Sequence, residues 1–387
     1  MEWSYIPFEE SIEKVTYTTK IPKKKFLSSG NYPIISQEAE FINGYWDNKD
    51  DVFDITDPVV IFGDHTKVVK HIDFNFVLGA DGVKVLKPIN ELNSRFFAYF
   101  LESAPVADLG YARHYRLLKE ISVPLPPISE QKRIVTILDQ AFSDIEQARA
   151  KTEQNLKNAR ELFESYLQQV FSQRGEGWVE TTLGQEINLL TGFAFKSKEY
   201  VTHTESIPLI RGDNIVQGKL RWDGVKLWAN DKVDEYEKYQ LKEDDILIAM
   251  DRTWVKAGMK YAKVTSEDLP ALLVQRVARL RCTDSLDPDY LYHLMGSKLF
   301  ETYVLSIQTG LGVPHISGKQ IQSFIFMRPS IEQQKIYVET MNELAGEVLK
   351  LNKIYESKLA ALDQLNKSIL QKAFSGELTK EKEGAAA

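Results

Sequence analysis

Two segments of this sequence carry side chains that suit contact with a phosphate backbone and with base edges. Residues 63–71 and 251–260 each mix hydroxyl, basic and ring side chains directly after an apolar run. Phosphates are bound by Lys, Arg, Ser and Thr, whereas base edges are read by side chains such as Arg, Lys, Asn and Gln. A hairpin with ordinary solvated charge is the alternative. The two segments occupy corresponding places in the two halves of the chain, and this correspondence favours binding. The candidate residues are Thr66, Lys67, Lys70, Arg252, Thr253, Trp254, Lys256 and Lys260.

A second pair of segments follows later in each half of the chain. Residues 110–119 interleave basic and aromatic side chains, which suits contact with both backbone and bases. Residues 309–320 are rich in glycine, so main-chain N–H groups could approach a phosphate closely. A loop that only closes each half of the chain is an equal alternative. The candidates are Arg113, His114, Tyr115, Arg116, Lys119, Thr309, His315, Lys319 and Gln320, with Arg211 added because it directly follows a predicted strand.

The sequence contains no pattern that would support catalysis by this chain. It has no G-x-x-x-x-G-K-[ST] phosphate loop and no G-x-G-x-x-G after a strand. It also lacks the Asn/Asp-Pro-Pro-aromatic run of an amino-methyltransferase. The six histidines are scattered, and with a single cysteine they do not give the spacing of a metal site. We therefore expect a non-catalytic protein with no metal ion or cofactor of its own.

Composition narrows the class of protein. The chain has 387 residues, 43% of them hydrophobic, which allows two or three domains with packed cores. The single cysteine, Cys282, excludes a disulfide framework. No signal peptide and no membrane-spanning apolar run are visible, so we expect a cytoplasmic protein. The net charge of −7 argues against a simple basic nucleic-acid binder, so any positive surface has to be assembled by folding.

The elements that must position these segments include two long helices that repeat each other. They are predicted over residues 127–173 and 329–378, and both begin at a P-x-x-E-Q-x-[KR]-I sequence and end in a similar Leu-Gln…Phe-Ser sequence. A helix of about 45 residues is roughly 65 Å long. The starts at Pro127 and Pro329 are 202 residues apart and the ends at Phe171 and Phe374 are 203 apart. We therefore expect a one-residue insertion in one copy, near Thr152.

Apolar residues recur at steps of mostly three and four along both helices, which predicts a narrow seam against a partner helix. The other repeat is the obvious partner, and antiparallel pairing would place the two remaining blocks of the chain at opposite ends. The predicted seam residues are Ile134, Leu138, Ala141, Ile145, Ala148, Leu156, Ala159, Leu162, Tyr166 and Val170 in the first helix, and Met341, Leu344, Val348, Leu351, Tyr355, Leu359, Leu362, Leu365, Ile369 and Ala373 in the second.

The remaining blocks, residues 1–126 and 174–328, share a skeleton of short strands followed by a helix. Strands are predicted at residues 32–35, 58–64 and 82–86 and at 207–210, 245–251 and 276–280, with helices at 95–101 and 290–295. We predict an α+β fold in which two mixed, strand-rich globular domains are joined by two long antiparallel helices. These helices would form a coiled coil, and the whole would be pseudo-twofold symmetric. Residues 379–387 are predicted to be a tail.

This pattern resembles the specificity subunits of Type I restriction–modification enzymes over essentially the whole chain. The resemblance rests on the helix starts at Pro127 and Pro329, the similar helix ends and the alternation with two unlike blocks. It implies that residues 1–126 and 174–328 are target recognition domains 1 and 2, and that 127–173 and 329–378 are spacer helices. Each domain would read one half of a bipartite, asymmetric site in double-stranded DNA.

The resemblance also implies partners. Two modification (methyltransferase) subunits would dock on the helices, and restriction/translocase subunits would join them, with no membrane involved. S-adenosylmethionine, ATP and Mg²⁺ would belong to those partners and not to this chain. The alternative is a two-headed coiled-coil scaffold that binds other proteins and no DNA, which the net charge of −7 favours slightly. An enzyme in its own right would need a catalytic constellation that the sequence lacks.

Overall fold

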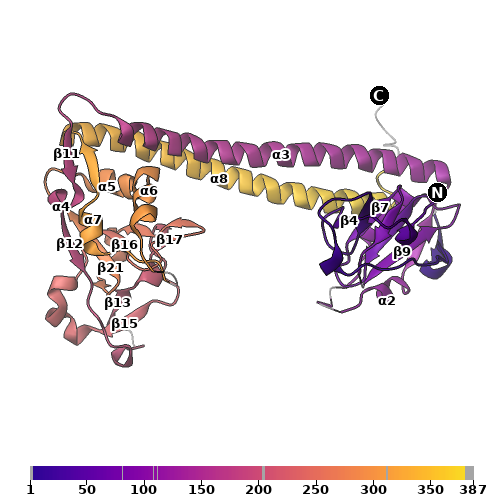
Figure 1. Cartoon of the computed structure of the whole chain (residues 1–387), viewed down its shortest axis with the longest axis horizontal. Coiled ribbons are helices and arrows are strands. Elements are labelled where there is room, and N and C mark those ends of the chain that lie inside the picture. Colours follow the sequence, from indigo (N-terminus) through magenta and orange to yellow (C-terminus); the bar gives the residue numbers. More distant parts are fainter. Residues whose placement is uncertain are drawn as a thin grey trace, which may run out of the picture. The chain divides into compact units, whose positions relative to one another are not determined.

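A computed structural model of the chain describes residues 3–80, 82–107, 109–110, 112–202, 205–310 and 313–379. Tyr111, His203, Gly312 and all but the first residue of the predicted tail lie outside these ranges. The chain folds into two compact units (Figure 1). Unit 1 comprises Met1–Glu153 and Glu356–Ala387, and unit 2 comprises Gln154–Tyr355.

The two predicted long helices are confirmed as α3 (Ile128–Ser172) and α8 (Ile331–Phe374). Both are rich in Ala, Glu, Gln, Lys and Leu, which favour helix, and a proline precedes each start. Each helix begins in one unit and ends in the other, so each unit contains the first half of one helix and the second half of the other. In unit 1, Ile134 from the start of α3 shares a core with Ala373 from the end of α8.

Unit 2 repeats this pairing with the helices exchanged. Phe171 from the end of α3 shares a core with Met341 from the start of α8, and the Tyr337 hydroxyl donates to Gln173 Oε1 at 3.0 Å. The predicted antiparallel order is therefore confirmed within each unit. Two seam predictions were wrong, because Leu162 is 64% exposed and Leu365 is 44% exposed.

The two long helices repeat each other at a constant separation in the sequence, so the insertion predicted near Thr152 is wrong. α3 begins at Ile128 and α8 at Ile331, which are 203 residues apart, as are the phenylalanines near the two helix ends. The P-x-x-E-Q-x-[KR]-I sequences align Pro127 with Pro329. The structure instead pairs Pro126 with Pro329, because these are the prolines whose carbonyl groups bind equivalent glutamines in the two helices.

The described residues of unit 1 form two four-stranded sheets and one two-stranded ribbon. Its further elements are β1 (Ser4–Pro7), η1 (Phe8–Glu10), β2 (Ile12–Glu13), η2 (Lys23–Lys25), β3 (Tyr32–Ile35), β4 (Gly44–Trp46), η3 (Lys49–Asp51), β5 (Val52–Phe53), β6 (Val59–Gly63), β7 (Val69–Ile72), β8 (Phe76–Leu78), β9 (Val83–Pro88), α1 (Ser94–Ser103), α2 (Tyr115–Leu118) and β10 (Ser122–Leu125).

The sheet of order β2-β9-β6-β7 is antiparallel throughout. Helix α1 links this sheet to α3, because Phe96 and Phe97 are buried in one core with Phe62 of β6 and Ile134 of α3. The second sheet, β4-β3-β8-β5, contains the parallel pair β3–β8. Strands β1 and β10 form the ribbon that leads directly into α3.

Unit 2 has the same skeleton. Its further elements are β11 (Val179–Thr182), α4 (Leu183–Glu186), β12 (Ile187–Thr191), η4 (Ser197–Glu199), β13 (Ser206–Ile210), η5 (Gly212–Asn214), β14 (Gln217–Gly218), β15 (Lys226–Ala229), η6 (Asn230–Tyr239), β16 (Ile246–Ala249), β17 (Trp254–Val255), β18 (Gly258–Met259), β19 (Tyr261–Lys263), η7 (Ser266–Asp268), β20 (Leu272–Leu273), β21 (Val277–Cys282), α5 (Pro288–Gly296), α6 (Lys298–Ile307), α7 (Gly318–Gln322) and β22 (Ile325–Arg328).

Strand order shows the duplication directly. The order β12-β21-β16-β19 matches β2-β9-β6-β7, and β15-β13-β20 matches β4-β3-β8, including a parallel pair. The ribbon β11–β22 leads into α8 as β1–β10 leads into α3. The strands and helices predicted in both blocks are confirmed. Unit 2 adds the ribbon β17–β18 and the helix α6 (Figure 1); no helix lies between α1 and α2 among the residues described there.

Candidate nucleic-acid interface

In unit 1 the two predicted segments lie against each other. The N–H of His114, in the later segment, donates to the Asp64 carbonyl oxygen in the earlier one at 2.7 Å. The N–H of Tyr115 donates to Asp64 Oδ1 at 2.8 Å. Asp64 is buried, with 4% of its surface exposed. These contacts join the loop after β6 and the segment that begins α2 into one surface.

Basic and aromatic side chains share that surface. Lys84 Nζ lies 5.1 Å from the centre of the Tyr115 ring, and Lys119 Nζ lies 6.0 Å from it, distances at which a cation and a ring attract each other. Lys119 also pairs with Glu9 at 2.7 Å. Lys84 was not predicted; it is half-buried, between the buried Val83 and Val85 of β9. The exposed candidates of unit 1 are Thr66, Arg113, Arg116 and Lys119.

Lys67 and Arg252 occupy the loops after β6 and β16, and both adopt a positive φ, of 59° and 48°. This left-handed conformation is unfavourable for a residue with a Cβ atom, and such strain is concentrated at functional sites. A basic side chain therefore stands at a strained position in the corresponding loop of each unit.

The structure places Lys70 in the interior, so it is withdrawn from the predicted contact surface. Its ammonium group donates to the carbonyl oxygens of Ser36 at 2.9 Å and Glu40 at 2.5 Å, and to Asn43 Oδ1 at 3.0 Å. Burial lowers the pKa of Lys70 to about 8. These bonds hold the loop over residues 36–43, in which Phe41 is 49% exposed. Phe41 is a candidate contact that sequence reasoning missed, because Lys70, which holds its loop in place, lies in another strand, β7.

His114 and Thr253 are also interior residues. His114 is fully buried, and its Nδ1 lies 3.1 Å from the Asp64 carbonyl oxygen. Thr253 is 1% exposed, and its hydroxyl donates to the Met250 carbonyl oxygen at 3.1 Å. A side chain enclosed in this way has no route to a phosphate, so both residues support their loops and are withdrawn as contact candidates.

In unit 2 the two predicted segments are again adjacent. The N–H of Arg252 donates to the Pro314 carbonyl oxygen at 2.6 Å, and the N–H of Ile316 donates to the Met250 carbonyl oxygen at 2.9 Å. The ribbon β17–β18 extends from this place (Figure 1), with the exposed Lys256 between its strands. Trp254 is half-buried, and its Nε1 donates to Glu301 Oε1 at 3.1 Å.

A third segment, around Arg211, joins this surface. Lys260 Nζ donates to the Gly212 carbonyl oxygen. Burial lowers the pKa of Lys260, and the nearby Arg221 and Arg252 charges lower it further. Arg221 was not predicted, and Arg276, whose Nε lies 3.7 Å from Asp251 Oδ2, was also missed. These positive groups come from loops far apart in the sequence, so no local pattern could have assembled them.

The remaining candidates lie at or before the start of α7. Lys319 is exposed, and Thr309 Oγ1 lies 3.3 Å from Nε2 of the exposed His315. Gln320 is engaged in the fold, because its Oε1 accepts from the Ser317 N–H at 2.8 Å and its Nε2 donates to the Ile307 carbonyl oxygen at 2.9 Å. The contact role predicted for Gln320 therefore competes with its role in capping α7.

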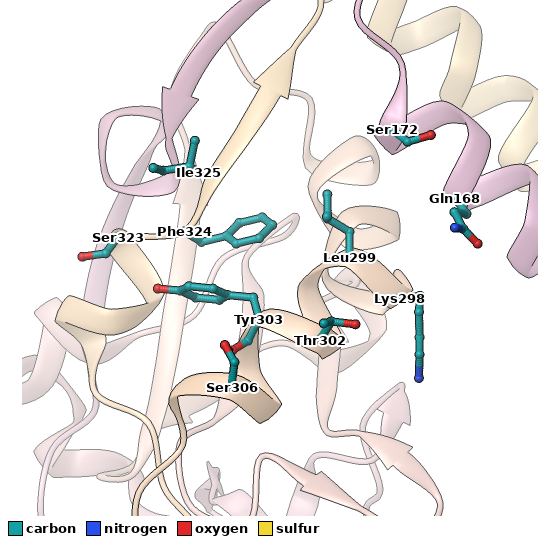
Figure 2. Close-up of a pocket in the computed structure, with 10 residues that line it drawn as sticks. All are labelled: Gln168, Ser172, Lys298, Leu299, Thr302, Tyr303, Ser306, Ser323, Phe324 and Ile325. Carbon is teal, nitrogen blue, oxygen red and sulfur yellow. The ribbon is translucent and has the colours of Figure 1, made fainter.

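Unit 2 also contains an apolar pocket of about 590 Å³ between the end of α3, α6 and the start of β22 (Figure 2). Tyr303 and Phe324 line it, with ring centres 5.0 Å apart. Its charged lining residue, Lys298, pairs with Glu301 at 2.8 Å. Over the described part of the chain, no group of three or more His, Cys, Asp and Glu side chains could hold a metal ion. No helix in those ranges is long and apolar enough to cross a membrane.

Comparison with known proteins gives a consistent family. The family model described as "Type I restriction modification DNA specificity domain" matches residues 3–156 and 175–359. The EcoAI specificity subunit of Escherichia coli is 37% identical over 195 residues, covering 49% of this chain and 32% of that protein. The EcoR124I/EcoR124II specificity subunit of Escherichia coli is 25% identical over 371 residues, covering 89% of this chain and 87% of that protein.

The MjaVIII specificity subunit of Methanocaldococcus jannaschii is 24% identical over 276 residues, covering 68% of this chain and 63% of that protein. The chain thus spans less than two thirds of the EcoAI and MjaVIII subunits. A solved chain from a type I R-M system superposes with a TM-score of 0.73 at 18% identity, covering 97% of this chain and 98% of that one. The HsdS subunit from Thermoanaerobacter tengcongensis superposes with a TM-score of 0.59 at 18% identity, covering 97% of each chain. At this identity the likeness shows the fold.

Proposed function

This chain belongs to the family of Type I restriction–modification specificity subunits, and from that premise we propose that it reads a bipartite, asymmetric site in double-stranded DNA. Target recognition domain 1 (residues 1–126) reads one half-site, and target recognition domain 2 (residues 174–328) reads the other. The chain itself is non-catalytic. It supplies the sequence specificity for partner subunits that modify or cut the DNA.

One observation carries the proposal. In each unit the strand skeleton brings two loops together by backbone hydrogen bonds, at Asp64 and His114 in unit 1 and at Arg252 and Pro314 in unit 2. The loops after β6 and β16 hold Lys67 and Arg252 in the same strained conformation. The backbone arrangement of these loops is the same in the two units, whereas the side chains that the loops carry differ. One backbone arrangement with two sets of side chains suits the reading of two different sequences by one chain.

The overall negative charge does not oppose this function. Phosphate contact requires positive charge only on the face that meets the backbone. Folding gathers Arg221, Arg252 and Lys260 around one place in unit 2. In unit 1, Lys84 and Lys119 flank Tyr115. Such clusters are the electrostatic pattern expected of a protein that docks on a duplex.

The long helices supply the second part of the proposed function. They dock two modification subunits, which bind S-adenosylmethionine and methylate adenine, and restriction/translocase subunits, which use ATP and Mg²⁺. Exposed apolar residues on α8, including Leu349 and Ile354 at 57% and 58% exposed, support a partner there. Because each helix enters both units, helix length also sets the distance between the half-sites.

Methylation mapping tests the proposal. The chain is co-expressed with the modification subunit of its own system, and methylated adenines are located by long-read sequencing. We expect two specific half-sites separated by a fixed, non-specific spacer. Exchange of residues 1–126 for target recognition domain 1 of another specificity subunit should change one half-site and leave the other. A change in both half-sites would contradict independent reading.

A two-headed protein–protein scaffold without DNA binding is the second candidate, and the net charge of −7 favours it slightly. The complex with modification subunits distinguishes the two in a gel shift on duplex DNA at several salt concentrations. DNA recognition predicts binding that weakens steeply with salt, because counterions are released on binding. A complex that assembles fully and retards no duplex at low salt would support the scaffold.

A further inference from the structure

A buried glutamine lies at the junction of each target recognition domain with its following long helix. In unit 1 this is Gln131, in the first turn of α3, which is fully buried. Its Nε2 donates to the carbonyl oxygens of Glu91 at 2.9 Å and Pro126 at 2.8 Å. Its Oε1 accepts from the N–H of Asn93 at 2.7 Å. One amide group therefore ties the start of α3 to the loop before α1.

Unit 2 contains the same arrangement, with its glutamine 203 residues later. Gln334, in the first turn of α8, is also fully buried. Its Nε2 donates to the carbonyl oxygens of Ser285 and Pro329, both at 2.9 Å. Its Oε1 accepts from the N–H of Asp287 at 2.8 Å. Each of the three bonds in unit 1 thus has a counterpart in unit 2.

The residues that the glutamines hold are themselves helix N-caps. The Asn93 side chain accepts from the N–H groups of Arg95 and Phe96, both at 3.0 Å, and so begins α1. The Asp287 side chain accepts from two N–H groups at the start of α5 in the same way. Because α1 and α5 pack on the sheets of their units, each glutamine connects a recognition domain to the long helix through one short chain of hydrogen bonds.

We propose that Gln131 and Gln334 are positioning residues that fix the angle between each target recognition domain and its spacer helix, and that they thereby set the spacing at which the two half-sites are read. This rests on the proposed function. Neither residue touches DNA, and both act through the helices that they orient.

The chemistry of the side chain supports this role. A primary amide offers two donors and an acceptor on one planar group, so it can satisfy three partners that meet at fixed directions. Leaving a buried polar group without a hydrogen-bond partner costs free energy. The angle between domain and helix at which all three bonds form is therefore preferred over neighbouring angles. The carboxylate of a glutamate at either position could accept from the N-cap residue and could not donate to the two carbonyl groups.

The test uses the complete complex with modification subunits and a panel of DNA duplexes. The duplexes carry both half-sites with the spacer unchanged, one base pair shorter or one base pair longer. We expect Gln131→Met and Gln334→Met each to lower the preference for the native spacer by roughly five- to tenfold, with unchanged half-site sequences. Gln131→Glu keeps the bond from Asn93 but places a buried carboxylate against two carbonyl oxygens, so it should lower the spacer preference at least as much as Gln131→Met. For any variant that folds poorly, the spacer ratio is measured on the fraction that assembles into the complete complex.

Two controls separate positioning from general stability. Gln140→Met makes the same change at an exposed position of the same helix and should leave spacer preference unchanged. Val85→Ala removes buried volume from the core of unit 1; it should lower methylation equally at every spacer and leave the ratio between spacers intact. The spacer ratio is methylation at the native spacer divided by methylation at an altered spacer. The proposal would be overturned if this ratio stayed, for both junction variants, within about twofold of the Gln140→Met value. A wild-type complex with no spacer preference would overturn both this proposal and the proposed function.

Discussion

Arg252 is the residue on which the reading of the second half-site can best be tested. Its exposed side chain lies in the loop after β16 with a φ of 48°. We expect Arg252→Ala to relax or weaken only the half-site read by unit 2, by about 1–3 kcal/mol if the guanidinium contacts a base edge. Methylation mapping with the partner subunits measures this. Lys67→Ala is the reciprocal control and should affect only the other half-site, and a uniform loss on all sequences would assign Arg252 to a phosphate.

Lys70 is a basic residue that supports a candidate contact loop from the interior of unit 1. Its ammonium group satisfies carbonyl oxygens in the loop over residues 36–43, which displays Phe41. We expect Lys70→Met to cost about 1–3 kcal/mol of unfolding free energy, because buried acceptors lose their donor. The loop would also lose order, so recognition of the first half-site should weaken. Chemical denaturation of the variant measures the cost, and the exposed Lys49→Met should leave stability unchanged.

At the scale of elements, His293 of α5 links the long helices to the sheet of unit 2. It is 5% exposed, its ring centre lies 6.1 Å from that of Phe163 in α3, and its Nε2 lies 2.8 Å from Asn342 Oδ1 in α8. Burial lowers the pKa of His293 below its ordinary value of 6.5, and the Lys263 charge acts in the same direction. Hydrogen bonding to Asn342 and the Asp287 and Asp289 charges act in the opposite direction.

This pKa shift predicts a pH dependence of stability. Below about pH 6.5 the unfolded chain binds a proton at this histidine that the folded chain does not, so unfolding takes up a proton. The unfolding free energy of unit 2 should therefore be greatest above pH 6.5 and fall as the pH is lowered. His293→Gln should flatten this dependence. Thermal unfolding at pH 7.5 and 5.5 gives the comparison, and an unchanged slope in the variant would show that other groups cause it.

For the whole molecule, the proposed function predicts that the length of the two long helices sets the distance between the half-sites. A helical turn of four residues adds roughly 6 Å. Insertion of one turn into both helices, after Glu153 and after Tyr355 where they pass between units, should lengthen the recognised spacer by about two base pairs. Both half-site sequences should stay the same. A methylation map with the original spacer would contradict this prediction.

Local patterns in the sequence are enough to identify the long helices, the paired strands and their duplication. The apolar periodicity around Leu138 and Met341 identified the long helices, and the short runs around Ile34 and Leu209 identified paired strands. Such patterns are local, because a residue's neighbours three or four positions away in a helix, or two away in a strand, share its face. The general places of the candidate loops followed from the ends of those strands.

Which side chains lie together and which are exposed could be learned from the folded chain alone. Lys70 and Lys84 are both basic residues of strands in the same sheet, yet one is enclosed by a loop 30 residues away and the other flanks Tyr115. The Gln131 and Gln334 junctions likewise corrected the alignment of the repeat by one residue. The physical reason is that periodicity specifies the face of an element, whereas burial and hydrogen bonding depend on distant segments that the fold brings against that face.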